Sequence, residues 1–186
     1  MVKFLCVLFL VFWSGGLSAE MRVYKYGEIP NVKELQKVLL QGKVASDEKA
    51  ESRLGKSKSL NIKIRATTEQ KAPLGCSEIA LPLLFEKNSY KLHNDQNTMQ
   101  TLENLSMALQ NQNIKLIIEG HTDAIGNKDY NLSLSRHRAA TVKDYLLKKG
   151  IKDSNLITRG MGFGKPLPGT DPFDAINRRV QFKVMN

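Results

Sequence analysis

Cysteine, proline and tryptophan are scarce in this chain of 186 residues, which has two Cys, six Pro and one Trp. Two cysteines, one of them in an N-terminal segment that we expect to be removed, leave no internal disulfide. With only six prolines and 13 glycines, the chain cannot be a collagen-like or proline-rich fibre. The one long hydrophobic run, residues 4–13, is about half the length that a transmembrane helix needs.

What is present suits a globular domain. Hydrophobic residues make up 41% of the chain and charged residues 25%, which is enough to fill a core and excludes wholesale disorder. The length fits one ordinary domain with a tail. Lys and Arg number 28 against 18 Asp and Glu, so the formal net charge is +10. This balance is compatible with anionic partners such as nucleic acid, acidic lipid or an acidic polymer.

Residues 1–19 have the pattern of a secretory signal peptide. Lys3 supplies the positive start, residues 4–13 are apolar, and Ala19 is a small residue before a cut ahead of Glu20. The alternative is an uncleaved membrane anchor, which the short apolar run disfavours. We therefore expect export and cleavage.

The two cysteines have different expected fates. Cys6 lacks the preceding small residues that a lipid-attachment site needs, so we expect no lipidation there. After cleavage Cys76 is the only cysteine of the chain. It is expected to be a small buried or linker residue, with an intermolecular disulfide as the alternative.

The mature chain divides into two parts by pattern. Residues 20–73 are predicted to be a polar N-terminal segment with a short helix and a linker over 42–59. The helix is indicated by apolar residues at helical spacing, namely Val32, Leu35, Val38 and Leu39. Residues 60–64 alternate in polarity like a strand. Residues 74–186 are predicted to form the folded domain.

In residues 74–186, strand patterns alternate with helix patterns. We expect strands over 79–85, 114–119, 156–160 and 180–184, and helices over 94–109 and 131–149. This order predicts an α/β (α+β) fold, a two-layer βαβαβ-type sandwich with helices packed on a four-stranded mixed sheet. The last strand follows a short loop and could pair in either direction.

The densest polar cluster, residues 120–126, directly follows the second expected strand. Loops at the carboxyl ends of strands are where α/β folds present binding groups. His121 and Asp123 could ligate a metal together with His93 or His137, but these scattered histidines provide no second close pair of ligands. We therefore expect no metal site.

Motifs for catalysis and for nucleic-acid binding are missing from the sequence. There is no Gly-x-Ser-x-Gly elbow, no phosphate-binding loop and no cysteine paired with a base. Basic residues are not interleaved with aromatic ones as in single-strand nucleic-acid binders. We expect a binding protein rather than an enzyme, with no cofactor and no nucleic-acid partner.

Two charged residues suggest what is bound. Asp123 can accept hydrogen bonds from an ammonium, and Arg138 can hold a carboxylate. Arg138 lies about two turns into its helix, and its side chain should lean back toward the Asp123 loop. A ligand with an amine and a carboxylate would fit between Asp123 and Arg138 if these two side chains stand apart from each other and are open to water. The alternative is that Asp123 and Arg138 pair with each other.

Several separated motifs occur in a recognisable order. They are residues 84–89, Gly120 to Asp123, Gly126, Tyr130 and Asn131, Leu134 and Ser135, Arg138 and Ala139, Val142, 160–162, and Asn177 to Val180. In this order they resemble the OmpA-like C-terminal domain, the peptidoglycan-binding module of bacterial envelope proteins. The resemblance covers about residues 79–185.

The resemblance implies binding of the peptidoglycan stem peptide, whose diaminopimelate carries an amine and a carboxylate at its side-chain end. The acidic ligand-binding position of the family falls on Asp123 and its arginine on Arg138. Further positions that line the site or brace its loop fall on Leu134, Ala139 and Asn131. For three residues both a structural role and ligand contact are left as alternatives, namely Thr122, Arg178 and Arg179.

The resemblance also implies a place in the cell. We expect an exported periplasmic protein, associated with the cell wall or the outer membrane, with no transmembrane segment in its mature chain. The lipidated cysteine of the lipoprotein members is absent from the sequence. As the alternative function, residues 20–73 bind a protein partner in an envelope complex, which would make the protein a structural adaptor.

Overall fold

The computed structural model of the chain describes residues 21–25, 27–51, 78–81, 83–86 and 88–185. The helices and strands follow one another as β1 (Met21–Val23), α1 (Val32–Glu51), β2 (Glu78–Leu81), α2 (Gln96–Leu109), β3 (Leu116–His121), α3 (Lys128–Lys148), β4 (Leu156–Gly162) and β5 (Val180–Val184). Two short 3₁₀ helices lie at Asp153–Asn155 and Ala175–Asn177. The predicted signal peptide, Cys76 and the possible strand over 60–64 lie outside the described residues.

The strands form one mixed sheet in the order β1-β2-β5-β3-β4. β3 and β4 are parallel because α3 carries the chain back between them. β5 is antiparallel to both of its neighbours, β2 and β3. The two-layer α/β architecture is confirmed, and the direction of the last strand, which the sequence left open, is antiparallel.

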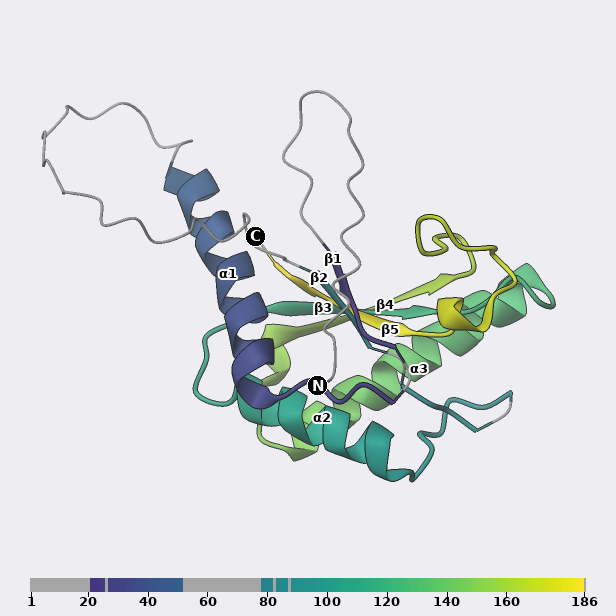
Figure 1. Cartoon of the computed structure of the whole chain (residues 1–186), viewed down its shortest axis with the longest axis horizontal. Helices are drawn as coiled ribbons and strands as arrows, with labels where there is room; N and C mark the ends of the chain where they lie inside the picture. Colours follow the sequence, from purple (N-terminus) through teal and green to yellow (C-terminus); the bar gives the residue numbers. More distant parts are fainter. Residues whose placement is uncertain (1–20, 26, 52–77, 82, 87, 186) are drawn as a thin grey trace, which may run out of the picture.

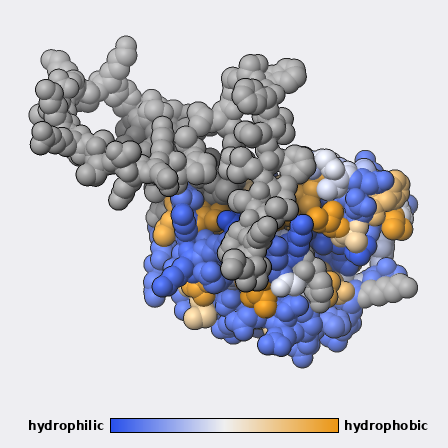
Figure 2. All heavy atoms as spheres, in the orientation of Figure 1, coloured by the Kyte–Doolittle hydropathy of each residue, from blue (hydrophilic) through white to orange (hydrophobic). Residues whose placement is uncertain are grey.

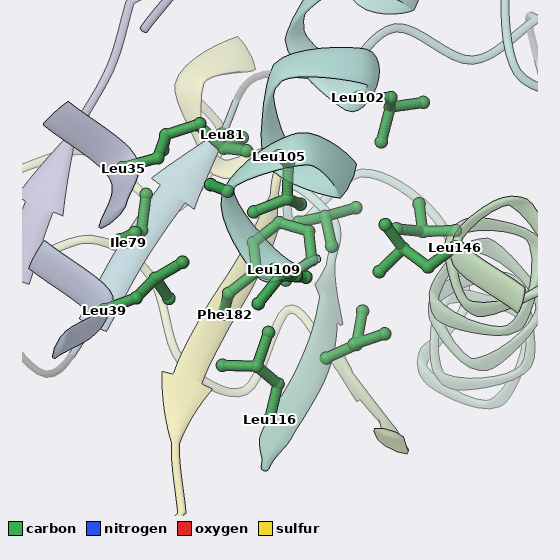
Figure 3. Packing of buried hydrophobic residues seen from close by; sticks show 14 of the residues in the cluster. Leu35, Leu39, Ile79, Leu81, Leu102, Leu105, Leu109, Leu116, Leu146 and Phe182 are labelled. Atoms are coloured by element: carbon green, nitrogen blue, oxygen red, sulfur yellow. The ribbon is translucent and has the colours of Figure 1, made fainter. Parts of the chain in front are cut away.

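The helices α1, α2 and α3 cover one face of the sheet (Figure 1). Alternate residues of each strand point toward them, as Leu116 and Ile118 do in β3 and Phe182 does in β5. Phe182 lies among leucines of α2, α3 and β3 (Figure 3) and is completely buried. Burial of a side chain of this size is worth about 2–3 kcal/mol. On the surface, hydrophilic side chains predominate over the described part of the face in Figure 2.

α2 and α3 begin at side-chain caps. Asp95 accepts a hydrogen bond from the backbone N–H of Thr98 at 3.0 Å and so caps α2. Asn127 caps α3 through the N–H groups of Asp129 and Tyr130. α3 therefore begins at Lys128, three residues before the predicted start.

Two glycines let α3 lie directly on the sheet. A Cβ atom at Gly120 of β3 would come within 2.1 Å of the Ser135 carbonyl oxygen. A Cβ atom at Gly160 of β4 would lie 2.2 Å from Cγ of Arg136 and 2.8 Å from the Leu132 oxygen. Only glycine allows this approach, which positions the start of α3 and the loop before it.

The N-terminal segment differs most from expectation. The sequence placed residues 20–73 outside the domain, yet β1 pairs in parallel with β2 and extends the sheet from the four expected strands to five. Leu35, Val38 and Leu39 of α1 are buried in the common core. α1 also runs to Glu51, into the predicted linker over 42–59. A strand of three residues has no periodicity to detect, and an apolar stripe does not reveal what covers it.

Other boundaries differ by a few residues. β2 ends at Leu81 rather than residue 85, β3 spans Leu116–His121 rather than 114–119, and β4 continues to Gly162. Within the described residues, no helix combines the length and apolarity needed to cross a membrane.

Candidate ligand-binding site

The loop between β3 and α3 is held on several sides. The Thr122 N–H donates to the Gly162 oxygen and the Ala124 N–H to the Pro172 oxygen, both at 2.9 Å. The buried Asn131 side chain donates through Nδ2 to the Ile125 oxygen at 2.8 Å. Gly126 turns the chain with a φ of +95°, which glycine adopts without strain. Asn131 therefore braces this loop, and Asp123 has a fixed position in it.

Asp123 lies at the base of the loop and is only 8% exposed. Its Oδ1 accepts from the Ile125 N–H at 3.4 Å. Its Oδ2 forms an ion pair with Nη1 of Arg178 at 2.8 Å. The Arg178 side chain is half exposed, so it covers the carboxylate from the solvent side.

Arg138, in α3, is held by different contacts. Its Nε donates to the Ser89 carbonyl oxygen at 3.1 Å. Its guanidinium carbon lies 4.8 Å from the ring centroid of Phe85, in a cation–π contact. Tyr130 joins the same loop to α3 by donating to the Asn88 oxygen at 3.3 Å. Arg138 and Asp123 form no ion pair with each other, so the alternative that they pair directly is not what the structure contains.

The requirement that both groups be open to water is not met. Arg138, like Asp123, is only 8% exposed. The guanidinium is covered by Phe85 and the Ser89 loop, and the carboxylate by Arg178. The two groups stand apart but are largely shielded, and the partner of Asp123 is an arginine 55 residues further along the chain.

The cluster carries an excess of positive charge. Burial lowers the pKa of the Arg138 guanidinium and the nearby Arg178 cation lowers it further, whereas Tyr130 and Asp123 oppose the shift. Two guanidinium groups thus lie near a single carboxylate, Asp123, which pairs with only one of them, Arg178. Such a cluster attracts an anionic group of a ligand.

Arg178 and Arg179 take opposite roles. Arg179 is buried and donates to the Lys165 oxygen and to Oε1 of Gln181, both at 3.1 Å. Burial lowers its pKa to about 10, against the effects of Glu119 and Glu78. Arg179 therefore joins the start of the last strand to the loop at Lys165, on the face of the sheet opposite the helices, while Arg178 reaches Asp123.

The remaining candidates differ in what they offer a ligand. Leu134 is half buried and lies one turn before Arg138 on the same face of α3. Thr122 is buried, and its hydroxyl has no hydrogen-bond partner among the described residues. Ala139 is completely buried in the core, so its methyl group has no surface for a ligand to contact.

Sequence reasoning missed three partners of Arg138 and Asp123. The Ser89 carbonyl is a backbone group, which residue type does not reveal. Phe85 stands in a motif of the resemblance, but nothing in its spacing indicates a cation–π contact. The pairing of Arg178 with Asp123 depends on how distant segments meet. In the described ranges, no group of three or more His, Cys, Asp or Glu side chains could hold a metal ion.

Sequence comparisons relate the chain to envelope proteins. The model of the OmpA family matches residues 84–179, more than half of the chain. Outer membrane protein A of Bordetella avium is 40% identical over 72 residues, which are 38% of this chain and 37% of that protein. The peptidoglycan-associated lipoprotein of Mesorhizobium japonicum is 33% identical over 101 residues, 53% of this chain and 59% of the relative. The chain thus spans less than two thirds of either relative.

Solved structures give the same relationship. The peptidoglycan-associated lipoprotein from Burkholderia pseudomallei is 26% identical, with a TM-score of 0.50 over 62% of this chain and 95% of that chain. The OmpA-like domain of FopA1 from Francisella tularensis is 22% identical, with a TM-score of 0.50 over 59% of this chain and 75% of that one. The second likeness supports the fold alone.

Proposed function

Because this chain belongs to the OmpA family, we propose that it binds the stem peptide of peptidoglycan without covalent chemistry and so anchors itself to the bacterial cell wall. The similarity to two peptidoglycan-associated lipoproteins supports this proposal. The ligand group is the side-chain end of diaminopimelate, with its ammonium on Asp123 and its carboxylate on Arg138.

One observation carries the proposal: Asp123 and Arg138 are fixed on different elements and do not neutralise each other. The loop after β3 holds the carboxylate, and Ser89 and Phe85 hold the guanidinium. Opposite charges fixed apart in this way suit a ligand that carries both signs of charge. Since both groups are mostly buried, water competes weakly for them once the ligand is bound.

Arg178 is the residue that the ligand displaces in this proposal. Its ion pair with Asp123 is half exposed on the arginine side, and such pairs contribute about 0–1 kcal/mol. The ligand ammonium takes its place on Oδ2 of Asp123. Arg178 then stays close enough to add a second cation for the ligand carboxylate, beside Arg138.

The other candidates have supporting roles. Leu134 contributes apolar surface next to Arg138, and Asn131 acts through the loop that it braces. The hydroxyl of Thr122, which has no hydrogen-bond partner among the described residues, is the further polar group that the loop offers a ligand. We leave Ala139 and Arg179 out of the contact set, because the first packs in the core and the second is buried on the face of the sheet opposite the helices.

The proposed location follows from the proposed ligand. Peptidoglycan binding places the protein in the periplasm, at the cell wall or near the outer membrane, after export by residues 1–19. The adaptor alternative relied on the helix within residues 20–73. The core of the same domain buries three residues of that helix, Leu35, Val38 and Leu39, which leaves less apolar surface for a partner.

Sedimentation with purified sacculi tests the proposal. The mature chain should pellet with sacculi, and free diaminopimelate should compete. Asp123→Asn and Arg138→Gln should each weaken binding at least tenfold, since a charge-assisted contact is worth about 1.5–3 kcal/mol. Asp129→Asn and Arg136→Gln are matched controls, because both side chains are exposed on α3 and neither contacts Asp123 or Arg138.

Two results would contradict the proposal. One is a mature chain that stays in the supernatant at every amount of sacculi. The other is equal sedimentation of the parent and of both site variants, which would mean that the wall is bound elsewhere.

A further inference from the structure

A groove with a volume of about 630 Å³ lies between α3 and β4. Its lining comprises residues 158–161 of β4 together with Ser133, Arg136, His137 and Ala140 of α3. Neither Asp123 nor Arg138 contributes to it. The groove is therefore a second feature, separate from the proposed peptidoglycan site.

The groove follows the edge of the sheet. Successive side chains of a strand point to opposite faces, so a cavity lined by four consecutive residues must run beside the strand. β4 is the last strand in the sheet order, and among the described residues only β3 pairs with it. The outer edge of β4 thus presents backbone N–H and C=O groups to the groove.

The groove has a cationic rim. Within the described part of the chain, the side chains of Arg136 and Arg159 form no ion pair or hydrogen bond. The aliphatic part of Arg136 lies against Gly160, where a Cβ atom would come within 2.2 Å of its Cγ. This contact keeps one guanidinium beside the strand edge. Ile157, one residue before the groove, is 44% exposed and adds apolar surface.

We propose that this groove binds an extended acidic segment of a partner protein, which adds as a strand to the outer edge of β4. Main-chain hydrogen bonds to β4 hold the segment, as in other cases of strand addition. Its carboxylates pair with Arg136 and Arg159, which select an acidic sequence.

Charge decides between this occupant and two others. A second copy of the chain would bring the same two arginines against their counterparts, and like charges across an interface disfavour it. The other alternative occupant is the alternating segment of this chain at 60–64. It lies within residues 53–65, which carry five Lys or Arg and no Asp or Glu, so the two arginines of the rim would repel it as well. An acidic partner is the occupant that complements the rim.

The test uses the full mature chain and labelled synthetic peptides, with binding followed by fluorescence anisotropy. One peptide repeats Val-Glu-Glu-Val, so that its glutamates reach both faces of the added strand, and its matched control has lysine for glutamate. We expect saturable binding of the glutamate peptide alone, weakening as salt is added. N-methylation of the amides on one edge of the glutamate peptide should abolish binding, because strand addition needs these donors.

Paired charge reversals locate the site. The double variant Arg136→Glu with Arg159→Glu should bind the glutamate peptide at least tenfold more weakly than the parent does. Lys33→Glu with Lys37→Glu makes the same change of net charge at exposed positions of α1 and should leave binding as in the parent. Urea unfolding of both double variants checks that they fold.

Three outcomes would overturn the proposal. Equal losses in the two double variants would mean unspecific attraction to a basic protein. Undiminished binding of the N-methylated peptide would exclude strand addition. Dimerisation of the peptide-free chain that is abolished by the Arg136 and Arg159 changes would assign the groove to a second copy.

Discussion

Acid is expected to destabilise the fold through His121, the last residue of β3. His121 is 1% exposed and faces a buried polar cluster with Arg179, Lys183 and Glu119. Burial is the main cause that lowers its pKa from 6.5 to about 3, and the cations Arg179, Lys183 and Lys165 lower it further, whereas the Lys165 backbone has the opposite effect. Neither ring nitrogen has a hydrogen-bond partner among the described residues. Nε2 is 3.9 Å from Oε2 of Glu119, too far for a hydrogen bond that would restore the charged form.

The depressed pKa of His121 determines whether the free energy of unfolding rises or falls with pH. Between pH 6.5 and pH 3 the unfolded chain binds a proton at His121 that the folded chain does not, so the free energy of unfolding falls as the pH falls. The loss from this group is about 2 kcal/mol at pH 5 and about 3 kcal/mol at pH 4. Well above pH 6.5, where the unfolded chain no longer protonates His121, the contribution is complete and constant.

Urea unfolding at a series of pH values measures the effect, with His121→Gln as the test variant. The variant should show a shallower fall of the unfolding free energy between pH 6.5 and pH 4 than the parent. His137→Gln, which changes an exposed histidine of α3, is the control. If the parent and His121→Gln lose stability in parallel over this range, the reasoning from burial of His121 is refuted.

Three further predictions concern the fold. Phe182→Ala should lower the free energy of unfolding by about 3–5 kcal/mol in urea titrations, because the ring is completely buried in the core; a loss below ~1 kcal/mol would contradict the packing in Figure 3. Gly120→Ala should destabilise the chain and weaken sacculus binding together, because the new Cβ would meet the Ser135 oxygen at 2.1 Å and push α3 from β3; Gly150→Ala, where no atom lies within 4 Å, tests the backbone strain alone. Deletion of residues 20–51 should lower the melting temperature relative to the mature chain, because it uncovers the residues that Leu35 and Leu39 bury; an unchanged melting temperature would restore the predicted domain boundary at residue 74.

Much of the fold follows from local patterns. The spacing of apolar residues predicts α2, and the alternation of Val180, Phe182 and Val184 predicts β5. β1 is missed because a strand of three residues is defined by its pairing with β2 rather than by its own sequence. α1 is recognised as a helix, but its place in the domain depends on which distant residues cover Leu35 and Leu39.

The site is predictable in its charges and less so in its contacts. Asp123 and Arg138 stand out by motif and spacing, and the structure holds them apart on separate elements. Their burial, the Ser89 carbonyl and the Phe85 ring arise from tertiary packing, which no short pattern contains. Arg178 appears in a recognised motif, yet its role as the cover of Asp123 depends on a contact across 55 residues.

Titration calorimetry with two stem peptides tests the binding account most directly. One peptide contains diaminopimelate, and the other contains lysine, which lacks the carboxylate at the side-chain end. The account predicts at least tenfold tighter binding of the diaminopimelate peptide to the mature chain, and a loss of this preference in Arg138→Gln. Equal affinities for the two peptides in the parent chain would contradict it.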